Sequence, residues 1–133
     1  MRATQVVEQL CLVLIGQQIA TRLLADASLA QLLDSEPGYS VAGEFGSMEQ
    51  ALERLGSASQ LPHAMLIDLG LPGMTGIEGI RIVRQRYPSI ALIVLTVFDD
   101  DRRIFDAICA GANGYLLKNT PPRRLFDGIR EVL

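Results

Sequence analysis

The sequence has little of the residue types that most often build thiol, imidazole or metal sites. It contains no Trp, one His and two Cys among 133 residues. His63 stands beside Pro62 just before an apolar run, which favours a loop residue over a catalytic base or a metal ligand. Neither Cys11 nor Cys109 has a second Cys or a His close by in the sequence, so both are expected to be small buried hydrophobic side chains.

Long apolar runs and an excess of basic residues are also missing. The longest apolar run, Leu10 to Ile15, is far too short to span a membrane, and the residues before it do not resemble those of a signal peptide. We therefore expect a cytoplasmic protein with no membrane partner. The net charge of −3 and the pI near 5.1 provide no overall basic field, so we do not expect this chain itself to bind nucleic acid.

What the sequence does contain is the pattern of one globular α/β domain. Hydrophobic residues make up 49% of the chain and charged residues 20%, as in a compact domain. Short apolar segments alternate with stretches of helical period, and this alternation predicts a parallel sheet with helices on both faces. At this length the usual solution is a flavodoxin-like fold with strand order 2-1-3-4-5. The expected strands are Leu10–Ile15, Tyr39–Phe45 at an edge, Ala64–Asp68, Ile90–Leu95 and Gly114–Leu117.

Capping residues mark the ends of the expected helices. Ser47 with Gln50 forms a capping-box pattern, and Pro88 ends the helix that follows Gly76. Asp99, Asp100 and Asp101 place negative charge where a helix N-terminus favours it. We expect Thr120 to cap the last helix and Pro121 to open it.

Polar residues stand at the end of several expected strands. Gly16 and Gln17 follow the first strand, Asp68 ends the third, Thr96 ends the fourth and Lys118 follows the fifth. In an open α/β sheet the carboxyl ends of the strands border the crevice where ligands bind. Each of these residues alone has an ordinary explanation as a strand terminator, but together they indicate a functional site.

The motifs around these residues resemble the receiver domain of two-component response regulators, and most closely the receivers that precede LuxR-type helix-turn-helix domains. They are Asp68 with Pro72 and Gly76 after it, LTVFDDD around Thr96, and AGANGYLLKNTPP around Lys118. The resemblance covers the chain from Leu10 to Leu133, with residues 1–9 as a short lead-in. It implies that Asp68 is the phosphoryl acceptor, that Lys118 contacts the phosphoryl group and that Thr96 moves toward it. It also makes Tyr115 either a switch aromatic or a plain core residue.

The sequence departs from the family at the metal site. Receivers of this kind carry an acidic pair where this chain has Gly16 and Gln17, and Gly70 offers only a backbone carbonyl. Mg²⁺ prefers hard oxygen ligands, usually including carboxylates. A family-like site with three acids and one lysine has a net charge of −2, whereas Asp68 and Lys118 alone sum to zero. We therefore expect no Mg²⁺ cofactor and weak or absent Mg²⁺-dependent phosphorylation of Asp68; the alternative is a conventional receiver phosphorylated there by a histidine kinase.

The expected partners follow from the resemblance and from charge. The helix after Asp101, the strand Gly114–Leu117 and the last helix form a face of mixed charge, which suits a homodimer or an ordinary solvated surface. The last helix is still in its apolar period at Leu133, and the resemblance implies a DNA-binding domain after it, through which alone DNA would be contacted. We expect no enzyme activity beyond self-phosphotransfer to Asp68. A nucleotide or flavin protein of the same fold is disfavoured, because no glycine-rich phosphate motif follows the first strand and Trp is absent.

Overall fold

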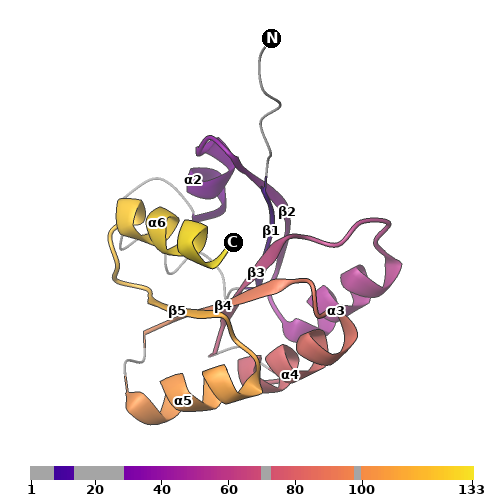
Figure 1. Ribbon diagram of the computed structural model, residues 1–133. Helices are drawn as coiled ribbons and strands as arrows, with labels where there is room; N and C mark the ends of the chain where they lie inside the picture. Colours follow the sequence, from indigo (N-terminus) through magenta and orange to yellow (C-terminus); the bar gives the residue numbers. More distant parts are fainter. Residues whose placement is uncertain (1–7, 14–28, 70–72, 98–99) are drawn as a thin grey trace.

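One parallel sheet organises the molecule (Figure 1). The computed structural model describes residues 8–13, 29–69, 73–97 and 100–133. Within these ranges the strands pair in parallel in the order β2-β1-β3-β4-β5, so the expected flavodoxin-like topology is confirmed, as is the edge position of β2. The strands are β1 (Glu8–Val13), β2 (Tyr39–Phe45), β3 (Ala64–Asp68), β4 (Ala91–Thr96) and β5 (Gly114–Leu117).

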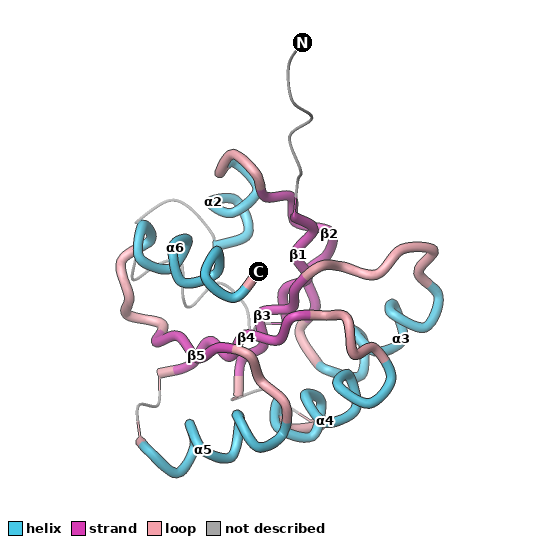
Figure 2. The backbone as a smooth tube through the Cα atoms, in the orientation of Figure 1, coloured by secondary structure: helices cyan, strands magenta, loops and turns pink. Residues whose placement is uncertain are grey.

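Helices cover both faces of this sheet (Figure 2). They are α2 (Leu29–Ser35), α3 (Met48–Ser57), α4 (Gly76–Arg86), α5 (Asp101–Ala110) and α6 (Pro122–Val132). Helices α2 and α6 lie on one face, and α3, α4 and α5 lie on the other. No helix within the described ranges is long and apolar enough to cross a bilayer.

The sequence of the central strand β3 does not alternate between apolar and polar residues. All five of its residues are buried, because helices cover both of its faces. Met65 and Ile67 belong to the core cluster under α3, α4 and α5, while Ala64 and Leu66 belong to the cluster under α2 and α6. Asp68 ends this strand, so packing on both sides fixes the position of its carboxylate.

Element boundaries match the expectations within a few residues, with two differences. Strand β1 begins at Glu8, two residues earlier than predicted, because Glu8 and Gln9 pair with Tyr39 and Ser40 of β2. The predicted end of that strand and most of the first predicted helix lie outside the described residues. Helix α6 begins at Pro122, with Pro121 at the N-cap and no side-chain cap hydrogen bond, so the predicted cap at Thr120 is wrong by one residue.

The predicted cap at Ser47 is present, and Asp100, predicted only to place negative charge at a helix start, also caps its helix. Ser47 Oγ accepts a hydrogen bond from the Gln50 N–H at 3.2 Å, and Asp100 Oδ1 accepts one from the Arg103 N–H at 2.9 Å. Asp101 lies in the first turn of α5. These contacts satisfy N–H groups that have no partner within the helix.

An arginine that the sequence did not single out joins the loops at the amino edge of the sheet. The Arg84 guanidinium, from the last turn of α4, donates hydrogen bonds to the carbonyls of Gly111, Pro88 and Ile90 and to Asn113 Oδ1. Asn113 Oδ1 also accepts from the Leu92 N–H. This network ties α4 to the loop between α5 and β5, at the edge away from Asp68.

The two cysteines differ in environment. Cys11 is buried in β1 as predicted, but Cys109 is exposed on α5, so the prediction that both are buried is wrong for Cys109. The prediction placed Cys109 in the apolar stripe of this helix, yet the residues of α5 that are buried against the core are Ala107 and Ala110.

This difference predicts selective labelling of the native protein. Burial raises the pKa of the Cys11 thiol to about 12, so it stays protonated at pH 8 and should not react with iodoacetamide, whereas Cys109 should react. Intact mass should therefore show one adduct on native protein and two in urea. Two adducts formed at equal rates without urea would contradict the burial of Cys11.

Candidate functional site

Asp68 and Lys118 form a buried ion pair at the carboxyl edge of the sheet. Asp68 is the last residue of β3, and Lys118 directly follows β5. The Lys118 Nζ lies 2.5 Å from Asp68 Oδ2, and the two side chains are only 11% and 4% exposed. The Asp68 carboxylate and the Lys118 ammonium thus neutralise each other where both side chains have little access to water.

Thr96 lies between these two residues in the sheet. It ends β4, the strand between β3 and β5, and it is fully buried. Its carbonyl accepts a hydrogen bond from the Lys118 N–H at 2.8 Å, which fixes the backbone of Lys118 beside β4. The structure therefore brings Asp68, Thr96 and Lys118 to neighbouring strand ends.

Tyr115 lies deeper in the sheet, as the second residue of β5. Its side chain is half-buried and packs against the core cluster under α3, α4 and α5. This packing agrees with a role as a core aromatic; its role as a switch remains a prediction.

Helix α4 starts in very close contact with the end of β3. A Cβ atom added at Gly76 would lie 2.8 Å from the Asp68 carbonyl oxygen and 3.0 Å from the Leu69 Cα. Both neighbours are backbone atoms, which cannot turn aside as a flexible side chain does. The glycine that follows the acid by eight residues is thus required by the approach of the helix to the strand.

We therefore expect Gly76→Ala to lower the free energy of unfolding by about 1–3 kcal/mol, as overpacking does in a rigid site. Gly56→Ala is the matched control, because Gly56 lies in α3 with nothing within 4 Å of an added Cβ. The control should be neutral or stabilising by up to about 1 kcal/mol, since Ala favours helix over Gly. Urea unfolding of the two variants checks this; equal stability of both would refute the close approach.

The predicted remainder of the metal site, Gly16, Gln17 and Gly70, lies outside the described residues. Within the described ranges no group of three or more His, Cys, Asp or Glu is placed to hold a metal ion. Asp68 is already paired with the Lys118 ammonium. Mg²⁺ needs several hard oxygen ligands in octahedral geometry, so the described donors do not fit it.

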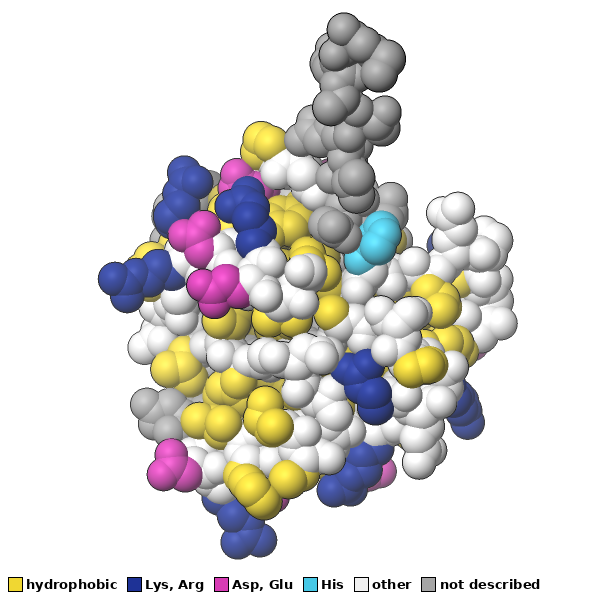
Figure 3. All heavy atoms as spheres, in the orientation of Figure 1, with side chains coloured by type: hydrophobic (Ala, Val, Ile, Leu, Met, Phe, Trp, Pro, Cys, Tyr) yellow, Lys and Arg dark blue, Asp and Glu magenta, His cyan; other side chains and the backbone are white. Residues whose placement is uncertain are grey.

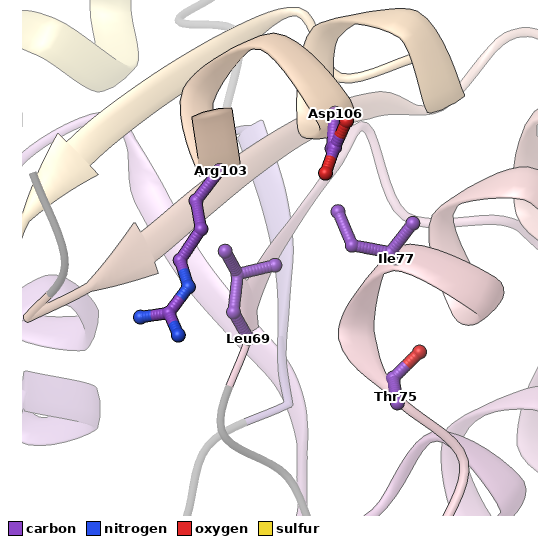
Figure 4. A pocket seen from close by; sticks show the side chains of 5 residues that line it. All are labelled: Leu69, Thr75, Ile77, Arg103 and Asp106. Atoms are coloured by element: carbon purple, nitrogen blue, oxygen red, sulfur yellow. The ribbon is translucent and has the colours of Figure 1, made fainter. Parts of the chain in front are cut away.

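A groove opens beside the site, between α4 and α5 (Figure 4). It has a volume of about 300 Å³ and is lined by Leu69, Thr75, Ile77, Arg103 and Asp106. Leu69 directly follows Asp68, and Arg103 extends from α5 alongside it. Arg103 has no signal in the sequence that marks it as a groove residue, because it is one of several charged residues on the mixed-charge face that includes the helix after Asp101.

The fold and this buried pair together define a flavodoxin-like α/β domain with a charged site at the carboxyl edge of its sheet. Residues 22–130 match the family model described as the response regulator receiver domain. The chain belongs to this family.

Curated relatives of similar sequence support the assignment. The chain is 35% identical over 104 residues to the DNA-binding transcriptional activator DevR/DosR of Mycobacterium tuberculosis, covering 78% of this chain and 47% of that protein. It is 32% identical over 123 residues to the nitrate/nitrite response regulator protein NarL of Escherichia coli, covering 88% of this chain and 56% of that protein. The chain thus spans about half the length of these relatives.

Solved structures agree with the fold. The crystal structure of a LuxR-family two-component response regulator from an Aurantimonas species superposes with a TM-score of 0.81 at 25% identity, over 95% of this chain and 84% of that one. The signal receiver domain of an HD domain-containing protein from Pseudomonas fluorescens gives a TM-score of 0.77 at 28% identity, over 95% of this chain and 94% of that one.

Proposed function

We propose that this receiver domain is a regulatory interaction module of a LuxR-class transcriptional regulator, with weak or absent Mg²⁺-dependent phosphorylation of Asp68. The observation that carries the proposal is the buried contact between Lys118 Nζ and Asp68 Oδ2. A divalent ion binds where negative charge is in excess, and this pair has none.

The size of the charge interactions also supports weak Mg²⁺ binding. A unit charge pair at 4 Å is worth roughly 4 kcal/mol at an effective dielectric near 20, so two missing carboxylates are a large loss of attraction for Mg²⁺. The residues at their positions, Gly16 and Gln17, are uncharged. A phosphoryl group on Asp68 would add about −1.5 to −2 charge, which Lys118 alone does not balance.

The second candidate is a conventional phosphoaccepting receiver that takes its phosphoryl group from a histidine kinase. The acid, the hydroxyl and the lysine that this chemistry uses are all at neighbouring strand ends. An Asp68 oxygen would attack the phosphorus of the donor, forming the new P–O bond as the bond to the leaving group breaks with its electron pair.

Intact mass after incubation with acetyl phosphate separates the two candidates. With Mg²⁺ present, the proposal expects an adduct on only a small fraction of the protein, and Asp68→Asn as the control should give none. A near-stoichiometric adduct that needs both Mg²⁺ and Asp68 would establish the conventional receiver instead.

We also propose that the face built from α5, β5 and α6 is the output surface and that a homodimer forms there. Figure 3 shows hydrophobic side chains gathered beside β5, below charged side chains of both signs over α6. On α5, Phe105 and Ile108 are 66% and 48% exposed. Charges of both signs suit a two-fold interface, because a patch that binds its own copy needs both.

Solution mass measured across protein and salt concentrations tests the dimer. A dimer on this face should dissociate in Phe105→Asp and weaken as salt rises, while Leu61→Asp, a change at an exposed leucine outside this face, should leave it intact. A protein that stays monomeric at all concentrations would contradict the proposed dimer. We propose that the whole protein binds DNA only through a further domain; the relative DevR/DosR is a DNA-binding transcriptional activator.

A further inference from the structure

We infer that Asn113 is a positioning residue for Lys118: it holds the start of β5 in register against β4, and this register brings the Lys118 ammonium onto the Asp68 carboxylate. The inference deepens the proposed function and rests on it, because the buried pair is the site that this function concerns. Asn113 is not among the site residues described above, since it lies before β5, at the edge of the sheet opposite Asp68.

The register of β5 is not fixed by deep burial. The strand has four residues, all of them half-buried, and it lies at an edge of the sheet, whereas every residue of β3 is buried. A slip by one residue moves a strand by about 3.3 Å and turns its side chains to the other face. The register of β5 therefore decides whether the Lys118 side chain reaches Asp68.

Asn113 fastens the start of β5 to a single residue of β4. Its backbone N–H donates to the Leu92 carbonyl at 2.7 Å, and its Oδ1 accepts from the Leu92 N–H at 2.8 Å. Because one residue takes both backbone polar groups of Leu92, a shifted β5 would lose both hydrogen bonds together. The regular pairing of Gly114–Leu117 with Ile93–Thr96 follows directly from this start.

Arg84 holds the Asn113 side chain in place. In a regular parallel ladder the Leu92 N–H would donate to the backbone carbonyl two residues before Asn113, which is that of Gly111. Here the Gly111 carbonyl accepts instead from Arg84 Nη2 at 2.7 Å, and the same Nη2 donates to Asn113 Oδ1 at 2.6 Å. The Arg84 Nη1 is itself anchored to the Ile90 carbonyl at 3.1 Å. The Asn113 oxygen thus takes over a ladder position, and Arg84 occupies the carbonyl that it replaces.

Helix α4 and strand β5 are consequently joined at both ends. Helix α4 begins at Gly76 against the Asp68 backbone and carries Arg84 in its last turn. Strand β5 begins after Asn113 and is followed by Lys118, whose Nζ contacts Asp68. The contact of Arg84 with Asn113 closes one end, and the contact of Asp68 with Lys118 closes the other. Loosening the first contact should therefore loosen the second.

The test follows the Lys118 ammonium directly. Lys118 is the one lysine of the chain, so protein made with ¹⁵N-labelled lysine gives a single side-chain ammonium signal in NMR. In the wild type this signal should exchange slowly with water, because the ammonium is buried against Asp68. In Asn113→Ala we expect exchange to be roughly tenfold faster, with the Nζ shift moving toward that of free lysine. Asn113 lies at the surface, so this change leaves the core intact.

Two further variants separate positioning from a general loss of structure. Asn113→Asp keeps an oxygen that can accept from Leu92 and Arg84, so exchange at Lys118 should stay within about twofold of the wild type. Arg84→Lys keeps the charge but not the fork of donors, and should speed exchange roughly threefold, which keeps the test usable if Asn113→Ala does not fold.

Ser47→Ala is the matched control for stability. It removes the cap hydrogen bond from the Gln50 N–H in α3, which follows β2 at the other end of the sheet. Thermal unfolding should show a loss of stability in this variant, while exchange at Lys118 should remain as in the wild type.

Three results would overturn the inference: wild-type exchange in both Asn113→Ala and Arg84→Lys, fast exchange in Asn113→Asp, or an equal acceleration in Ser47→Ala. The measurement uses neither Mg²⁺ nor a phosphoryl donor, so none of these results touches the proposed function. That function fails instead on a near-stoichiometric Mg²⁺-dependent adduct at Asp68.

Discussion

Lys118→Met is expected to lower the free energy of unfolding by about 3–5 kcal/mol, the typical cost of removing one partner of a buried ion pair. Methionine fills a similar volume but leaves the Asp68 carboxylate without its ammonium in a site that is almost closed to water. Urea unfolding at neutral pH measures the change. Arg130→Met is the control, because its pair with Asp127 is half-exposed at 3.5 Å and should contribute less than about 1 kcal/mol.

The variants of Asp68 make this prediction specific to a balanced pocket. Asp68→Asn should also destabilise the protein, because it leaves the Lys118 ammonium buried without the Asp68 carboxylate. The double variant Asp68→Asn, Lys118→Met should recover much of the stability that either single change loses. In a pocket with excess acid, removing one carboxylate would relieve repulsion and stabilise the protein. A more stable Asp68→Asn would therefore contradict the charge balance that we describe.

Restoring the missing acids should restore the metal site. The double variant Gly16→Asp, Gln17→Asp puts carboxylates at the two positions where the family resemblance implies the acidic pair, and each carboxylate contributes attraction of the order of a few kcal/mol to a cation about 4 Å away. We expect Mg²⁺ affinity to rise at least about tenfold, into the millimolar range, together with a Mg²⁺-dependent adduct from acetyl phosphate. Isothermal titration and intact mass are the measurements.

A control with the same net charge separates local from general effects. Ser57→Asp, Gln60→Asp adds two charges at the exposed end of α3 and in the loop before β3, at the amino edge of the sheet. It should leave Mg²⁺ binding as in the wild type. If the restored acids bind no better than this control, losses other than the carboxylates dominate the pocket.

The topology and the grouping of Asp68, Thr96 and Lys118 at one edge of the sheet were predictable from the sequence for physical reasons. Buried strands appear in the sequence as unbroken apolar runs, and glycine, proline and capping residues separate these runs from the helices. The order of strands and helices therefore follows from the sequence pattern. Asp68, Thr96 and Lys118 could be grouped because parallel strands end at one edge. The structure adds the contact of Lys118 Nζ with Asp68 Oδ2, which pattern alone does not give.

The features that the sequence did not reveal depend on side-chain direction and on contacts between distant segments. Cys109 falls in a hydrophobic stretch of α5, but the faces of a helix are set by its packing, and this residue points to solvent. Arg84 and Asn113 are 29 residues apart, so their hydrogen bond has no local signature. Arg103 looks like any surface arginine until α4 and α5 are placed on either side of the groove.

The most direct test of the central claim is a magnesium titration of the wild-type protein, followed at the Thr96 amide with and without beryllofluoride. Pairing of the Asp68 carboxylate with the Lys118 ammonium predicts no saturable shift at millimolar Mg²⁺ and the same beryllofluoride affinity with or without the ion. Saturable millimolar binding with a shift at Thr96 would contradict it.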